Sequence, residues 1–241
     1  MSKVLIKSVI TIVFLVMLMA VPVYGASINK SITVNAGSES GGESSVNGSI
    51  TVEEGAVVTG ALSTVNGSIR VGDNAQVENV ETVNGSLKIS SGVTSEGLST
   101  VNGAIGVGDK TAVDGAIEAV NGRISLDNGS SVSGNVENVN GEISLKGSEI
   151  GGDLTTVNGD IDLSDASVIK GDIIVEEPGG WSFGWTNSRT PEITIGPGSR
   201  VDGKIRLERE VKLFISDTAK VGGVEGELSM DDAVRFSGER P

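Results

Sequence analysis

The chain has 241 residues with 32 acidic and 18 basic side chains, a net charge of −14, and neither cysteine nor histidine. So acidic a protein lacks the basic surface that phosphate groups require, which excludes a nucleic-acid partner. The two missing residue types exclude disulfides, thiolate or imidazole metal sites and histidine-dependent catalysis, and we expect no metal, no cofactor and no enzyme activity.

Residues 1–25 have the pattern of a secretory signal peptide. Two lysines precede an apolar run at 9–20, and small residues follow, with cleavage expected after Gly25 or Ala26. The alternative is a retained membrane anchor, because the run is only a few residues short of the ~17 to 25 that span a bilayer. Pro22 and the small residues favour removal, which leaves 16 basic residues against 32 acidic ones. We expect a periplasmic, secreted or cell-surface protein with no stable membrane span after cleavage.

Residues 26–225 are dominated by a tandem repeat. Val-Asn-Gly occurs seven times at intervals of 18 or 19 residues, and aliphatic residues recur three and five positions after each asparagine. No aromatic residue occurs between positions 26 and 177, so the core must be narrow. The repeated asparagines are Asn47, Asn66, Asn84, Asn102, Asn121, Asn140 and Asn158.

The short repeat predicts an all-β fold, a single-stranded parallel β-helix (β-solenoid). Alternation with a period of two indicates strands, glycines indicate turns, and 18 or 19 residues suit three strands with three corners. One coil buries too little apolar surface to be stable alone, so about ten coils must stack through hydrogen bonds at ~4.8 Å spacing. A hairpin array or sandwich is the alternative, since Asn-Gly also favours hairpin turns. The strict period favours the stack.

The repeated asparagines are expected to be architectural. Amides one coil apart can form a buried Asn ladder along the axis, and the following glycine can accept positive φ at the corner. Asp73 and Asp109, each seven residues after a repeat asparagine, raise a calcium hypothesis. The Gly-Gly-x-Gly-x-Asp pattern of calcium-binding β-rolls is missing, which favours solvated charges and no metal.

An insert at 176–192 interrupts the repeat at the corner that elsewhere carries Asn-Gly. It contains Trp181, Phe183 and Trp185, with prolines at both ends of the segment 178–191. Exposed aromatic residues on a loop favour a binding platform for glycan or another envelope component. In the alternative, the three aromatic side chains pack against the flank of the solenoid.

The two ends of the repeat array differ in sequence. Less regular coils follow the insert up to residue 225, and residues 226–241 are predicted to form a tail or cap over the last edge. Residues 35–45 are rich in Gly, Ser and Glu. We interpret this first coil as an uncapped end that can pair with another molecule.

The repeat resembles a known bacterial family. The Ala-x-Val-x-Gly-x-Leu pattern at 56–62 and its variant at 131–136 resemble bactofilins, the polymer-forming family, and Thr64–Ile69 is similar to coils of adhesin-type β-solenoids. The resemblance implies a right-handed triangular β-helix that polymerises end to end without nucleotide. This chain differs from bactofilins in its signal peptide, asparagine ladder and insert.

Three functions remain open from the sequence. The first is a non-catalytic, exported structural or adhesive protein that scaffolds or self-assembles in the cell envelope or at the surface. The second is a glycan- or envelope-binding module that uses the insert. The third is a polysaccharide-active β-helix enzyme, for which the sequence offers only scattered Asp, Lys and Arg. The expected partners are therefore another copy of the chain or envelope components.

Overall fold

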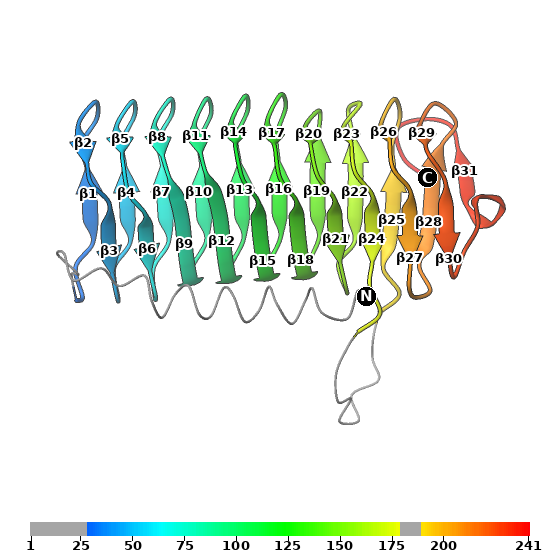
Figure 1. Ribbon diagram of the computed structural model, residues 1–241, viewed down its shortest axis with the longest axis horizontal. Helices are drawn as coiled ribbons and strands as arrows, with labels where there is room; N and C mark the ends of the chain where they lie inside the picture. The colour runs from blue at the N-terminus through cyan, green and yellow to red at the C-terminus, as the bar shows by residue number, and fades with distance from the viewer. Residues whose placement is uncertain (1–27, 179–188) are drawn as a thin grey trace.

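The computed structural model describes residues 28–178 and 189–241, which form one elongated parallel β-solenoid (Figure 1). Each coil contributes one strand to each of three parallel sheets, so the predicted fold class is confirmed. The signal peptide predicted at 1–25 lies outside the described residues.

The three sheets run the length of the solenoid, and the strands of each stack in the order of the coils. The first sheet has eleven strands: β1 (Ile32–Val34), β4 (Ile50–Val52), β7 (Ile69–Val71), β10 (Leu87–Ile89), β13 (Ile105–Val107), β16 (Ile124–Leu126), β19 (Ile143–Lys146), β22 (Ile161–Ser164), β25 (Glu192–Ile195), β28 (Lys212–Ser216) and β31 (Val234–Phe236). The second has ten: β2 (Glu39–Ser40), β5 (Val57–Val58), β8 (Gln76–Val77), β11 (Thr94–Ser95), β14 (Ala112–Val113), β17 (Ser131–Val132), β20 (Glu149–Ile150), β23 (Val168–Ile169), β26 (Arg200–Val201) and β29 (Lys220–Val221). The third also has ten: β3 (Glu43–Ser45), β6 (Leu62–Thr64), β9 (Asn79–Asn84), β12 (Gly97–Asn102), β15 (Ile117–Asn121), β18 (Val136–Asn140), β21 (Leu154–Thr156), β24 (Ile173–Val175), β27 (Ile205–Leu207) and β30 (Val224–Gly226).

The core consists of aliphatic columns in exact register from coil to coil. Leu87 pairs with Ile69 below it and with Ile105 above it, and each of these side chains is at most 1% exposed. Side chains alternate between the core and the surface along each strand, because successive residues of a strand point to opposite faces. The spacing of aliphatic residues in the sequence therefore predicted the inward columns correctly.

The C-terminal segment 226–241 adds a further rung to one sheet. After the 3-10 helix η2 (Met230–Asp232), β31 pairs with β28, and Phe236 is buried. The first sheet consequently extends one strand beyond the other two.

The glycines of the Asn-Gly corners are required for close stacking. Only Gly141 has a positive φ, 124°, so the expected left-handed corner is wrong for the other six. A Cβ on Gly103 would instead collide with the carbonyl of Gly85, the equivalent glycine one coil earlier. The same collision with the backbone of the preceding coil recurs at all seven corners. Glycine is needed here because the backbones of neighbouring coils approach too closely to admit a side chain.

We expect Gly103→Ala to destabilise the fold by about 1 to 3 kcal/mol, because the backbone must shift to relieve the overlap. Gly106→Ala is the matched control, since a Cβ there would meet only Ser125 Oγ at 3.6 Å. The control should change stability by no more than about 0.5 kcal/mol. Urea unfolding of both variants measures the difference, and equal effects would contradict the close-stacking explanation.

Candidate functional site

The Val-Asn-Gly corner joins the third sheet to the first and repeats with the same side-chain orientations. In its fourth occurrence, Thr100 points into the core and is 1% exposed, Val101 is half-buried and faces outward, and Asn102 is exposed. The corner thus combines a buried polar residue, an outward valine and an exposed amide in three successive residues.

The corner asparagines form one continuous chain of side-chain hydrogen bonds. Each Nδ2 donates to Oδ1 of the asparagine one coil earlier, over 2.7–3.0 Å. Asn29 of the first coil joins the seven repeat asparagines as the first acceptor. All seven hydrogen bonds run in the same direction: each amide nitrogen donates toward the N-terminal end of the solenoid.

The ladder lies on the surface. Of its members, Asn140 is half-buried and the other seven are exposed. The expectation that the amides are buried is therefore wrong, because the corner turns the asparagine side chains outward. Water can hydrogen-bond to an amide that loses its neighbour, so one rung contributes less than a buried hydrogen bond would.

A second column, polar except at Ala119, lies inside the corner, and the repeat pattern did not lead us to predict it. It occupies the position two residues before each repeat asparagine: Ser45, Thr64, Thr82, Thr100, Ala119, Asn138 and Thr156. Thr64, Thr82 and Thr100 donate from Oγ1 to the carbonyl of the glycine in the preceding coil, over 2.8–3.0 Å. The recurrence of Ser and Thr at an inward strand position was the signal that could have revealed it.

Arg209 closes the ladder where the insert interrupts the repeat. Its Nη1 donates to Asn158 Oδ1 at 2.7 Å and to the Val157 carbonyl at 2.9 Å. Its Nη2 donates to the carbonyl of Arg189, at the far root of the insert. One guanidinium therefore satisfies the last acceptor of the ladder and ties it to the insert.

The three aromatic residues predicted as a binding platform, Trp181, Phe183 and Trp185, lie outside the described residues. The far root of the insert is firmly attached. Arg189 forms an ion pair with Asp160 at 2.8 Å, and the other oxygen of Asp160 accepts from the Glu192 backbone at 2.9 Å.

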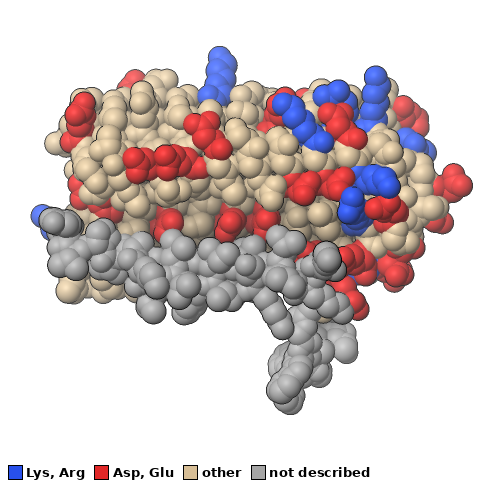
Figure 2. Space-filling model, viewed as in Figure 1, with Lys and Arg blue, Asp and Glu red and all other residues tan. Residues whose placement is uncertain are grey.

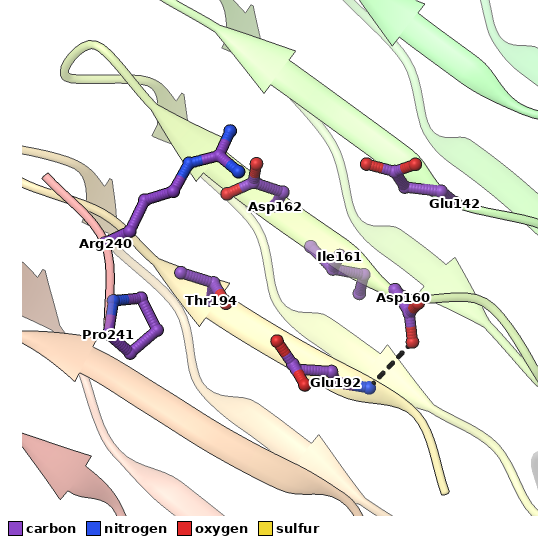
Figure 3. Close-up of a pocket in the computed structure, with 8 residues that line it drawn as sticks. All are labelled: Glu142, Asp160, Ile161, Asp162, Glu192, Thr194, Arg240 and Pro241. Atoms are coloured by element: carbon purple, nitrogen blue, oxygen red, sulfur yellow. Dashed lines mark hydrogen bonds between the residues drawn. The ribbon is translucent and has the colours of Figure 1, made fainter. Parts of the chain in front are cut away.

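A shallow acidic hollow lies beside this root, on the outer face of the first sheet. Its lining includes Glu142, Asp160, Asp162 and Glu192, and Figure 3 shows Arg240 of the C-terminal tail pointing toward Asp162. Burial raises the pKa of Asp162, and Arg240 opposes the rise.

Arginines neutralise much of the charge in this region. Glu142 pairs with Arg123 at 2.7 Å, and basic side chains gather over the C-terminal coils (Figure 2). The ion pairs among the described residues all join positions between 123 and 225. The hollow is thus part of an ion-pair network on the wall of the solenoid.

Asp73 and Asp109, the residues of the calcium hypothesis, lie exposed in turns between the first and second sheets. Asp73 Oδ1 accepts from the Ser91 backbone at 2.9 Å, which holds it to the next coil. Within residues 28–178 and 189–241, no group of three or more Asp or Glu side chains is placed to hold a metal ion.

Glu176, at the near root of the insert, is the most strongly perturbed acid in the described part of the chain. Its side chain is 6% exposed. Burial raises its pKa to about 7, and the charges of Glu208 and Glu137 add to the rise. In the stack Glu176 takes the place that valine holds in the regular corners.

No family model, curated protein or solved structure matches this chain. Among the residues that the structure describes, no helix has the length and hydropathy needed to cross a membrane.

The buried and the exposed columns of the corner should differ in energetic weight. We expect Thr100→Val to cost about 1 to 3 kcal/mol, because the Gly85 carbonyl loses a buried donor. Asn102→Ala should cost only about 0.5 to 1 kcal/mol, since water replaces its partners. Chemical denaturation of the two variants checks the order, and a larger loss for Asn102→Ala would show that the ladder dominates.

The protonation of Glu176 should make stability depend on pH. Its folded-state pKa of about 7 exceeds the ordinary 4.5, so the folded chain keeps a proton that the unfolded chain releases. Stability is then highest below about 4.5 and declines as the pH rises to about 7. Thermal midpoints across this window should fall for the wild type and fall less for Glu176→Gln. The control is Glu177→Gln at its exposed neighbour, and an unchanged slope in Glu176→Gln would exclude Glu176 as the source.

Proposed function

We propose that this protein is an exported, non-catalytic structural protein that serves as a rigid rod in the cell envelope or at the cell surface. The observation that supports it best is the uninterrupted stack: three parallel sheets keep their register from the first described coil to the last. In such a solenoid every coil is held by hydrogen bonds to its neighbours, which resists bending and holds surface side chains at fixed spacing. The signal-peptide pattern at 1–25 supports export.

The bactofilin resemblance favours end-to-end self-assembly. Whether this chain can polymerise in that way depends on the surfaces at the two ends of the solenoid. Head-to-tail polymers would require flush, apolar ends. At the C-terminal end, β31 gives the first sheet a rung that the other two sheets lack, so the edges of the three sheets are not level. This unevenness supports a rod of defined length.

The N-terminal end carries polar groups in core positions. Ser40 stands in register with Val58, and Glu43 with Leu62, two fully buried core residues of the next coil. Ser40 Oγ donates to Glu43 Oε1 at 2.8 Å across this open end. Stacking another molecule there would bury a carboxylate, which is strongly unfavourable without a partner charge. This first coil, interpreted from its sequence as uncapped, has the polar end surface of a capping repeat.

A glycan- or envelope-binding module is the second candidate. The insert that carries Trp181 and Trp185 has a root fixed by Arg189 and Arg209, which supports a loop held at a defined place on the rod. The two candidate functions are compatible, because a rigid structural rod can also carry a binding loop at one position.

The rod proposal predicts an elongated monomer. The protein isolated from extracytoplasmic fractions should begin after Gly25 or Ala26 and sediment as a single extended species at all concentrations. Ser40→Val combined with Glu43→Leu should restore an apolar end and produce end-to-end dimers in sedimentation and electron microscopy. Thr94→Val on the outer wall is the control and should remain monomeric.

Two outcomes would contradict this proposal. Filaments of the unaltered protein that lengthen with concentration would favour the polymer implied by the resemblance. Retention of the uncleaved chain in the cytoplasm would exclude export.

A further inference from the structure

The chain contains eight Asn-Gly pairs, the dipeptide most prone to spontaneous deamidation. Glycine has no side chain to hinder attack of its backbone nitrogen on the preceding asparagine amide. Seven of the pairs are the repeat corners, and the eighth is Asn128-Gly129. A protein with so many labile pairs should lose amides quickly unless the fold protects them.

In the ladder, both the side-chain nitrogen and the side-chain oxygen of each of the seven corner asparagines are hydrogen-bonded. Each Nδ2 donates to the preceding asparagine, and each Oδ1 accepts from the next one, with Arg209 as the final donor to Asn158. Ring closure requires the side chain to rotate toward the following nitrogen. Both hydrogen bonds must break before a corner asparagine can react.

Asn128 lacks this restraint. It lies exposed in the turn between β16 and β17, and its side-chain amide has no hydrogen-bond partner among the described residues. Gly129 is also exposed and has φ of 70°. The pair therefore differs from the other seven in the freedom of its side chain.

The backbone around Asn128 is no freer than at the corners. The Gly129 nitrogen donates to the Gly147 carbonyl at 2.8 Å. Gly103 and Gly122 make equivalent bonds to the next coil, at 3.0 and 2.9 Å. Asn102 and Asn121 are thus useful comparators, because the attacking nitrogen is hydrogen-bonded in the same way at all three sites. The sites differ in the side-chain amide and in the following glycine, which has a positive φ only at Asn128, so the variants described below separate the two causes.

We propose that Asn128 is a modification site, where the folded protein undergoes water-dependent conversion to aspartate and isoaspartate, and that the ladder protects the seven corner asparagines from the same reaction. The Gly129 nitrogen forms a bond to Asn128 Cγ as the Cγ–Nδ2 bond breaks. Ammonia leaves with the proton from the Gly129 nitrogen, and a cyclic imide remains. Water then adds to either imide carbonyl and opens the ring.

The two kinds of site differ in what conversion does. At a corner it would replace a donor with a carboxylate oxygen facing the Oδ1 of the asparagine below, which would open the ladder. At Asn128 it adds a negative charge to an exposed turn beside Asp127. The ladder therefore preserves the amides on which its own continuity depends, and this inference holds whether or not the rod function is correct.

Peptide mapping by mass spectrometry tests the proposal. The full chain is incubated folded, at mildly alkaline pH in ¹⁸O-labelled water, and label uptake is followed at each of the eight pairs. Two side-chain hydrogen bonds must open at a corner and none at Asn128, while the bond of the glycine nitrogen must open at both. We therefore expect Asn128 to convert roughly ten-fold faster than Asn102 or Asn121. In denaturing urea the eight rates should converge.

Corner asparagines that convert as fast as Asn128 in the folded protein would overturn the proposal. So would slow conversion of Asn128 in both states, or a rate difference that persists in urea.

A ladder variant identifies the cause of protection. Asn84→Ala removes one hydrogen bond from Asn66 and one from Asn102, so these two should convert several-fold faster while Asn140 is unchanged. Arg209→Ala should accelerate Asn158 in the same way. Thr94→Ala, on the second sheet, should alter none of the eight rates. If Asn84→Ala does not fold, the site-by-site comparison in the wild type still decides the question.

Discussion

In-register stacking is the constraint on which the rest of this structure depends. The strand residues of each coil lie in register with those of the next coil, at the strand spacing of ~4.8 Å. A side chain must therefore be compatible with the residues directly before and after it in the same column. In the core, aliphatic side chains pack on one another from coil to coil. At the corner, asparagine amides can stack because each one both donates and accepts a hydrogen bond. Glycine occupies the positions where the backbones of neighbouring coils approach most closely.

Carboxylates satisfy the stacking rule poorly, and the structure shows the consequence. Glu118 stands in register with Glu137, and the pKa of each is raised, chiefly by burial, with Glu137 adding to the rise at Glu118. At the near root of the insert, Glu176 has its pKa raised to about 7 by burial and by Glu208. The pKa values of these wall carboxylates are thus raised first by burial between the coils and further by the like charges of neighbouring acids.

The hydrogen bonds of the asparagine ladder all run in one direction, and its two ends have different partners. All donors point toward Asn29, so Asn158 Oδ1 is the last acceptor, and the insert leaves no asparagine in the next coil to donate to it. Arg209 supplies a charged donor there, much as cationic side chains serve the carbonyl end of a helix. The same guanidinium binds the Arg189 carbonyl, so the end of the ladder and the start of the next regular strand depend on one residue.

The sequence by itself determined the solenoid, its coil length and its inward columns, because stacking copies each local preference into a periodic pattern that can be read directly. The tertiary structure decided which side of the corner faces water. A period-two pattern cannot show that Thr100 points inward and Asn102 outward. It also cannot show that Gly103 is required because the backbone of the preceding coil lies too close for a side chain, and not because of a positive φ. The tertiary structure also decided that Arg209, 51 residues from Asn158, closes the ladder, since no repeat relates the two positions. Contacts between equivalent positions of the repeat can be predicted from the sequence, because the same residue types recur at a fixed interval. Contacts between positions that the repeat does not relate form only when the coils stack, so they are seen only in the tertiary structure.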